Sequence, residues 1–297
     1  SNDQSITNLG TINVSFSNVE GGIDGNNNFD SDPQFCNTSI GNYQLAFLSP
    51  SVSAGENGET IGFYNEPGCQ SAYLNHALEF DGQDDYVDLG NSSEFDFSNS
   101  PFSLTCWIKV NSDSWYNNII SKSSSDDKGW YLALETGNNS NNGQITFSGV
   151  DESGTNRFTL YSMSNYDLNT WYYIAVVFEN GEQKFYFDGE LVDVGTHPYN
   201  LYNVNNNLLI GYGANDHFDG IVDDISIWDR AITANEIINY STTSPSGIEE
   251  GLVGHWNFNE GNGNVLTDLS GNGNDGIIYG ATWIDNGAPL QAPEPVP

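Results

Sequence analysis

The 297-residue chain carries 40 acidic side chains against 6 lysines and arginines, which gives a formal net charge of −34 at pH 7. No lysine or arginine precedes Lys109 or follows Arg230. Nucleic acids and anionic membrane surfaces are bound through clustered cations, so this charge distribution excludes both as partners. Salt or divalent cations would screen the self-repulsion, which favours a saline, calcium-containing extracellular setting.

Two features concern the ends of the chain and its relation to membranes. Every apolar run is shorter than the roughly 20 residues of a membrane-spanning helix, so we expect no direct membrane insertion. The first ten residues lack the charged and apolar regions of a secretion signal. The ending APEPVP is typical of a linker, so we interpret 291–297 as a tail and the chain as a piece of a longer protein.

The first seventy residues hold short strand-like runs separated by long, irregular spacers rich in Asn and Gly. A compact sandwich would have shorter connections, so we predict a separate unit over residues 1–70. Cys36 and Cys69 lie in this region. A disulfide between them would stabilise the fold by roughly 3–4 kcal/mol in the chain-entropy model, and the alternative is two independently buried thiols.

After this region, short alternating runs bounded by Gly, Asn and Asp predict an all-β sandwich or barrel. Residues 171–195 are a three-strand meander, because Asn180-Gly181 and Asp188-Gly189 tolerate the positive φ angles of tight hairpin turns. Thr233 and Glu236 have capping-box spacing and predict one short helix at 233–240. Cys106 is predicted to be an inert thiol in the core. The remaining predicted strands are 102–110, 118–122, 130–135, 144–150 and 207–212.

The segments ALEFDGQDDYVDLG (77–90), FSLTCWIKV (102–110), the meander, LLIGYG (208–213) and FDGIVDDISIWDRAITANEI (218–237) occur in a characteristic order. Together they resemble the bacterial laminin-G-like, or concanavalin A-like, jelly roll. The resemblance implies a jelly-roll domain over residues 71–245. Residues 246–290 are similar to the lead-in that usually precedes such a domain. They either complete this sandwich or open a further one, and we favour the first because they are too short to bury two tryptophans alone.

A second resemblance covers the N-terminal unit. VSFSNVEGG (14–22), FDSDPQFCN (29–37), GNYQLAFLSPSVSAG (41–55) and IGFYNEPGC (61–69) are similar to the terminal coils of a right-handed parallel β-helix in large bacterial surface proteins. In that family two cysteines flank the last coil, which supports a Cys36–Cys69 disulfide. The resemblance implies that earlier coils, with any active site that they carry, would precede this segment in a longer protein.

The jelly-roll resemblance also implies a calcium site, because related folds use one Ca²⁺ to tie the opening strand to the last. The corresponding ligands would be Asp81, the Gly82 carbonyl and Asp223, which are oxygen donors of the kind that Ca²⁺ prefers. The alternative is that Asp81 only shapes the turn at Gly82 while Asp223 is a solvated residue at a strand end.

We assign no catalytic residues. Glycoside hydrolases of this fold use an ExDxxE strand, but the nearest match, Glu79 to Asp84, ends in Asp and coincides with a non-catalytic opening strand. The four histidines are scattered, and the sequence contains no metalloprotease, nucleophile-elbow or phosphate-loop motif.

Sugar-binding proteins place aromatic faces against the C–H faces of a sugar and frame them with polar groups. Trp107, Trp171, Phe178, Tyr186 and Trp228 fall in strand motifs and are predicted to pack in the core or on a sheet. Aromatic residues near predicted loops are the candidates for ligand contact, and the alternative is that they only cap strand ends. These candidates are Trp115, Tyr116, Trp130, Tyr212 and His217.

We therefore expect a non-catalytic, calcium-stabilised module of a bacterial surface or secreted protein that binds polysaccharide or a cell-surface glycan, or mediates adhesion. One alternative makes the chain the accessory region of a polysaccharide lyase or glycoside hydrolase whose catalytic coils are absent. Another makes it a structural spacer that docks another protein.

Overall fold

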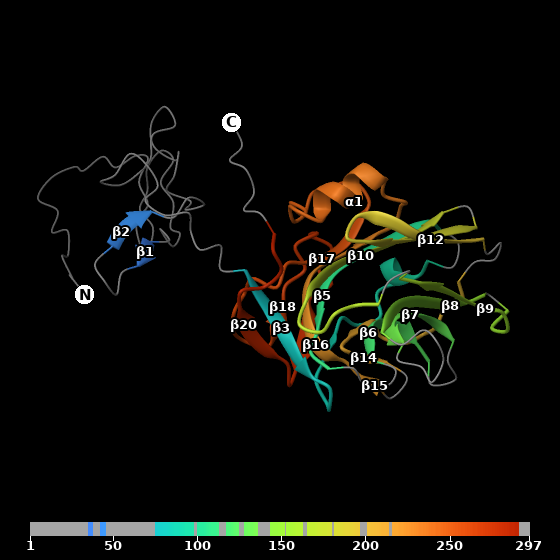
Figure 1. Cartoon of the computed structure of the whole chain (residues 1–297), viewed down its shortest axis with the longest axis horizontal. Helices are drawn as coiled ribbons and strands as arrows, with labels where there is room; N and C mark the ends of the chain where they lie inside the picture. The colour runs from blue at the N-terminus through green and yellow to red at the C-terminus, as the bar shows by residue number, and fades with distance from the viewer. Residues whose placement is uncertain are drawn as a thin grey trace, which may run out of the picture. The chain divides into compact units, whose positions relative to one another are not determined.

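We describe the protein from a computed structural model (Figure 1). It describes residues 75–97, 100–112, 117–124, 128–135, 143–151, 153–162, 165–179, 181–196, 201–213 and 216–290, and the backbone of 35–37 and 42–45. The chain divides into two units, 1–73 with 294–297 and 74–293.

The first unit contributes one described feature, the antiparallel pairing of β1 (Phe35–Asn37) with β2 (Asn42–Leu45). The predicted β-helix coils of 1–70 and the Cys36–Cys69 disulfide otherwise lie outside the described residues.

The second unit is an all-β sandwich of two antiparallel sheets, as the sequence predicts (Figure 1). In the described residues the first sheet has eight strands: seven pair in one continuous order, and β17 pairs with β16 outside that order. In spatial order these strands are β12 (Glu190–Thr196), β11 (Glu182–Phe187), β10 (Trp171–Glu179), β5 (Phe102–Val110), β16 (Asp219–Trp228), β3 (His76–Asp81) and β20 (Thr282–Asp285), with β17 (Leu252–Trp256).

The second sheet also has eight strands in the part that the structure describes, and a small hairpin folds beside it. Its spatial order is β18 (Val265–Leu266), β19 (Gly276–Tyr279), β4 (Tyr86–Asp88), β13 (Leu209–Ile210), β6 (Asn118–Ser123), β7 (Gly129–Glu135), β8 (Gln144–Val150) and β9 (Arg157–Tyr161). The hairpin consists of β14 (Tyr212–Gly213) and β15 (Asp216–His217).

The local signals in the sequence correspond to these elements. Asp188 and Gly189 have φ angles of 49° and 80°, as the tight turn between β11 and β12 requires. The helix α1 (Ala234–Tyr240) begins with the predicted capping box, in which the Thr233 hydroxyl accepts from the Glu236 backbone N–H and Glu236 accepts from that of Thr233. Both predictions are confirmed.

Two apolar clusters stabilise the sandwich. The larger lies between the sheets and includes the fully buried Cys106, whose thiol pKa is raised by burial. The smaller lies on the outer face of the first sheet, beneath α1 (Figure 1). There Trp228 stacks on Tyr240 with ring centroids 5.1 Å apart. Of the tryptophans assigned to packing, Trp107 and Trp228 are buried and Trp171 is partly buried against the smaller cluster.

Residues 246–290 take part in both sheets. β17 pairs with β16, β20 pairs with β3, and β19 pairs with β4. Trp256 on β17 is fully buried, and its indole N–H donates to the Asn274 carbonyl at 3.0 Å. This segment therefore supplies core side chains and sheet hydrogen bonds to the same unit that begins near residue 75.

No helix in the described ranges has both the length and the apolar character needed to cross a bilayer.

Truncating Trp256 tests the contribution of the C-terminal segment to the core. Trp256→Ala should lower the free energy of unfolding by about 3–5 kcal/mol, because it leaves a large cavity in a packed interior. Chemical denaturation followed by fluorescence measures the change. Ile248→Ala is the control, because Ile248 is 91% exposed and its truncation should change stability by less than about 0.5 kcal/mol. Equal stability of the two variants would show that residues 252–256 do not belong to the core.

Candidate functional site

An acidic turn joins β3 to β4. Asp81 ends β3, and its two carboxylate oxygens accept from the backbone N–H and the side-chain amide of Gln83, both at 2.9 Å. Asp85 accepts from the Asp81 backbone N–H at 2.9 Å. These bonds close a compact turn in which Asp81 shapes the chain locally, as one of the two interpretations of the sequence supposes.

Three carboxylates converge at this turn. Asp81, Asp84 and Asp85 each offer an oxygen, and these oxygens lie within 4.8 Å of one another. Burial, followed by the charges of Asp81 and Asp84, raises the pKa of Asp85, although its hydrogen bond from the Asp81 backbone acts in the opposite direction. A divalent cation would relieve this repulsion, and the donors are the hard oxygens that Ca²⁺ takes.

The structure does not bring Asp223 to this turn. β3 and β16 are neighbours, but Asp81 lies opposite Asp219 in the antiparallel register. Asp223 is four residues further along β16, roughly 13 Å away at about 3.3 Å per residue. It is fully buried, not solvated, and accepts from the backbone N–H groups of Asp224 and Ala288, each at 2.8 Å.

Asp223 belongs instead to a buried polar cluster at a β-bulge in β16. The register shifts between Asp223 and Ser226, and Asp224 has a φ angle of 46°. Asp224 accepts from the Ser244 hydroxyl at 2.6 Å and lies 3.8 Å from His255 Nδ1. Burial raises the pKa of both Asp223 and Asp224. Ser, His and Asp meet here, but Asp224 and His255 are enclosed by protein, so a substrate cannot reach them.

A row of aromatic rings lies beside the acidic turn. Tyr279 on β19 is directly opposite Tyr86 on β4, and their rings stack with centroids 4.6 Å apart and an interplanar angle of 15°. Tyr86 also meets Tyr212 at 6.0 Å, and Tyr212 stacks on His217 at 4.4 Å. We call Tyr279, Tyr86, Tyr212 and His217 the aromatic row.

The row lies on the outer face of the second sheet. Val87 and Ile278 alternate with Tyr86 and Tyr279 along the strands and point into the core, so the tyrosines point outward. Tyr279 is 45% exposed, and Val265 and Ile277 beside it are exposed too. The row therefore ends in an open apolar surface next to polar groups.

The acidic turn and the aromatic row form one site. Gly280 follows Tyr279 with a φ of 80°, and a Cβ there would lie 1.9 Å from the Asp85 carboxylate, so only glycine lets the two loops approach this closely. At the other end of the row, His217 Nδ1 lies 3.4 Å from the Asp85 carbonyl. Asp85 thus lies next to Gly280 at one end of the row and next to His217 at the other.

Two of the five predicted ligand residues, Tyr212 and His217, lie in this row. Trp130 is 3% exposed and packs with Phe102 and Phe147 between the sheets, and it also lines the small pocket described below. Its contact with a ligand stays a prediction. Trp115 and Tyr116 lie outside the described residues.

Sequence reasoning missed Tyr86 and Tyr279. The signal was present as alternation, because each lies next to an apolar residue in a short strand, in DYVDL and IIYG. Alternation marks them as outward-facing, but nothing local shows that they are cross-strand partners.

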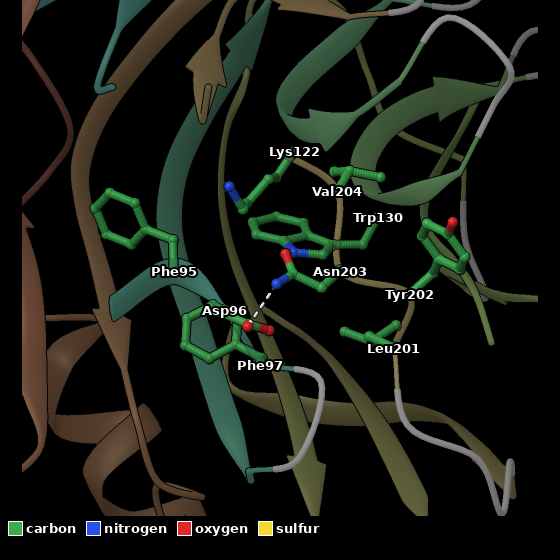
Figure 2. Close-up of a pocket in the computed structure, with 9 residues that line it drawn as sticks. All are labelled: Phe95, Asp96, Phe97, Lys122, Trp130, Leu201, Tyr202, Asn203 and Val204. Carbon is green, nitrogen blue, oxygen red and sulfur yellow. Dashed lines mark hydrogen bonds between the residues drawn. The ribbon is translucent and has the colours of Figure 1, made fainter. Parts of the chain in front are cut away.

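A pocket of about 190 Å³ lies at a different place on the second sheet (Figure 2). Lys122 is buried there, and its ammonium donates to the Asn91 side chain at 2.5 Å and the Asn206 carbonyl at 2.7 Å. Burial lowers the pKa of Lys122. Asn203 donates to Asp96 at 2.5 Å. The polar side chains at this pocket are therefore already hydrogen-bonded to groups of the protein.

The profile of the concanavalin A-like lectin/glucanases superfamily matches residues 81–238, just over half of the 297-residue chain. The chain belongs to this superfamily. Among curated proteins, none matches the sequence.

The fold is shared with one solved structure, and a second is similar to a smaller part of the chain. A Bacteroides ovatus protein proposed to bind carbohydrate is 19% identical with a TM-score of 0.60, covering 73% of this chain, and this chain spans 62% of that one. Domain 4 of an extracellular arabinanase from Geobacillus stearothermophilus, in complex with arabinotriose, is 18% identical with a TM-score of 0.44, covering 55% of this chain and 75% of that one. At these identities the likeness concerns the fold alone.

The buried carboxyls predict a pH-dependent stability. Because burial raises the pKa of Asp224, the folded state retains its proton to higher pH than the unfolded state does. The contribution of Asp224 to stability is therefore greatest below the unfolded pKa of about 4 and is lost as the pH rises through the folded pKa.

Urea unfolding at a series of pH values tests this. The free energy of unfolding of Asp224→Asn should fall less steeply with pH than that of the native chain, since Asn can still accept from Ser244 and tolerates a positive φ. Asp229→Asn, an exposed acid on the same chain segment, should keep the native slope. An unchanged slope in Asp224→Asn would contradict the assignment.

Proposed function

We propose that this chain is a non-catalytic carbohydrate-binding module of a secreted or surface protein, and that the sugar binds on the aromatic row. The observation that carries the proposal is the outward-facing set of four rings beside a group of carboxylates in a concanavalin A-like domain. Its membership of a superfamily that contains lectins supports this choice.

The chemistry of the row suits a sugar. Pyranose rings present C–H groups that pack on aromatic and aliphatic side chains, and here Tyr279 is flanked by the exposed Ile277 and Val265. Sugar hydroxyls require fixed polar partners, which Asp88 and Asn207 offer next to the row. The Asn207 amide donates to both oxygens of Asp88 at 2.9 Å, which fixes the orientation of the pair. A mainly apolar surface with a few oriented polar groups is the usual composition of such a site.

The site is preformed by hydrogen bonds behind the rings. The Ser121 hydroxyl donates to the Tyr212 carbonyl at 2.7 Å, and the Asn118 amide donates to the Gly213 carbonyl at 2.8 Å. These bonds attach the β14–β15 hairpin to β6. A ligand that binds a preformed surface loses less free energy to ordering the protein.

Substitution of the row tests this function. Tyr279→Ala and Tyr86→Ala should each weaken binding to the glycans that an array identifies by about tenfold or more, as expected for an aromatic anchor. Isothermal titration calorimetry on purified oligosaccharides measures the loss. Tyr161→Ala is the control, because Tyr161 is a partly exposed tyrosine on β9 and outside the row.

Unchanged affinity in both row variants would place the sugar elsewhere. Absence of binding to any glycan would remove the proposed function itself.

We also propose that Ca²⁺ binds at the acidic turn, held by Asp81, Asp84 and Asp85 with the Gly82 carbonyl as a further donor. The mutual spacing of the three carboxylates supports this set. When bound, the ion would neutralise the turn and fix the β3–β4 connection. Asp223 is not included, because its oxygens are bonded elsewhere.

Thermal unfolding after chelation tests the metal. With an affinity of about 10⁻⁴ M, which is usual for extracellular modules, about 10 mM Ca²⁺ should stabilise the folded state by about 2.7 kcal/mol. The unfolding midpoint should rise with Ca²⁺, and Asp84→Asn should abolish the rise while Asp229→Asn retains it. A midpoint that is independent of Ca²⁺ in the native chain would exclude the site.

A further inference from the structure

Negative charge surrounds the aromatic row on several sides. Asp81, Asp84 and Asp85 precede Tyr86, and Asp88 follows two residues later on the same face of β4. At the far end of the row, Asp216 is paired with Gly213 in the hairpin that carries His217. The row is therefore flanked by carboxylates at both ends.

These carboxylates bond to neutral donors. Asp81 accepts from Gln83, Asp85 from a backbone N–H, and Asp88 from Asn207 and the Gly90 backbone. Within the described ranges, none of the flanking acids forms an ion pair with a lysine or arginine. Their charges are therefore not neutralised by the protein.

The basic residues of the chain are all engaged elsewhere. The whole sequence has only 6 lysines and arginines. Lys184 pairs with Glu182, and Arg230 pairs with Glu236. Lys109 lies over the Trp171 ring, Lys128 over Tyr202 and Arg157 over Tyr131. Lys122 is buried at the separate pocket. No side chain of fixed positive charge is left to pair with an anionic ligand at the row.

We propose that, in the calcium-free chain, the aromatic row discriminates between glycans by charge: it accepts neutral sugars, favours sugars with free amino groups, and rejects those with carboxylates or sulfates. This inference rests on the proposed function and adds the class of ligand. An ammonium group gains both a carboxylate and a tyrosine ring face as partners. An anionic group meets like charges within the screening length of about 8 Å and has no cation to pair with.

The test uses oligosaccharides of one length that differ in charge. Hexamers of glucosamine carry free amino groups, hexamers of N-acetylglucosamine are neutral, and hexamers of hyaluronan carry carboxylates. Neutral agarose and sulfated carrageenan oligosaccharides form a second pair. Binding is measured on a broad array and by calorimetry, with chelator present. Binding should be at least tenfold weaker for an acidic oligosaccharide than for its neutral counterpart. It should be strongest for the glucosamine oligosaccharide, which carries free amino groups. The difference should shrink at high salt, because screening weakens the repulsion.

Charge-removing variants identify the source of the selectivity. Asp216→Asn should narrow the gap in affinity between acidic and neutral glycans without loss of neutral binding, and Asp229→Asn should leave the gap unchanged.

The outcomes separate this inference from the proposed function. Tight binding of uronate- or sulfate-bearing glycans that Tyr279→Ala abolishes would overturn the charge selection and leave carbohydrate binding intact. No binding to any member of the array would overturn both. Binding of neutral and amino glycans alone, lost in Tyr279→Ala, supports both.

Discussion

The pairing of β16 is the constraint on which the rest of the module depends. This strand lies between β5 and β3 and also pairs with β17 beyond the bulge at Asp223 and Asp224. It thereby joins the opening strand, a central strand and the C-terminal segment in one sheet. Because β3 continues directly into the acidic turn, the register of β16 against β3 also sets where Asp81 lies.

Fold and candidate site share the same C-terminal segment. β17 supplies Trp256 to the core, while β19 supplies Tyr279 to the outer face of the second sheet. Closure of the sandwich therefore completes the aromatic row, since Tyr86 without β19 would lack its stacked partner. The carboxylates that give the row its charge come from two widely separated stretches of the chain, near residues 81–88 and at 216, so the electrostatic character of the surface is a property of the closed fold.

The sequence predicted much of the fold because its signals were local. Asp188-Gly189 determines a turn through the φ angles of two neighbouring residues, and the capping box of Thr233 and Glu236 needs only one helical turn. The candidate site was harder to predict. The sequence did not show that Trp130 is buried, because the polar Lys128-Gly129 before it suggested a loop. The family resemblance placed Asp81 and Asp223 together on neighbouring strands. The strands are neighbours, but antiparallel register sets Asp219, not Asp223, opposite Asp81.

By itself, the sequence determined the charge, the all-β class, the meander and the helix, because each follows from composition or from residues a few positions apart. Only the tertiary structure decided which outward-facing tyrosines become neighbours, which acids converge and which are buried. The physical reason is that strand pairing is a long-range choice. A shift of one residue in register turns a side chain to the other face of the sheet, and no local pattern encodes the partner strand.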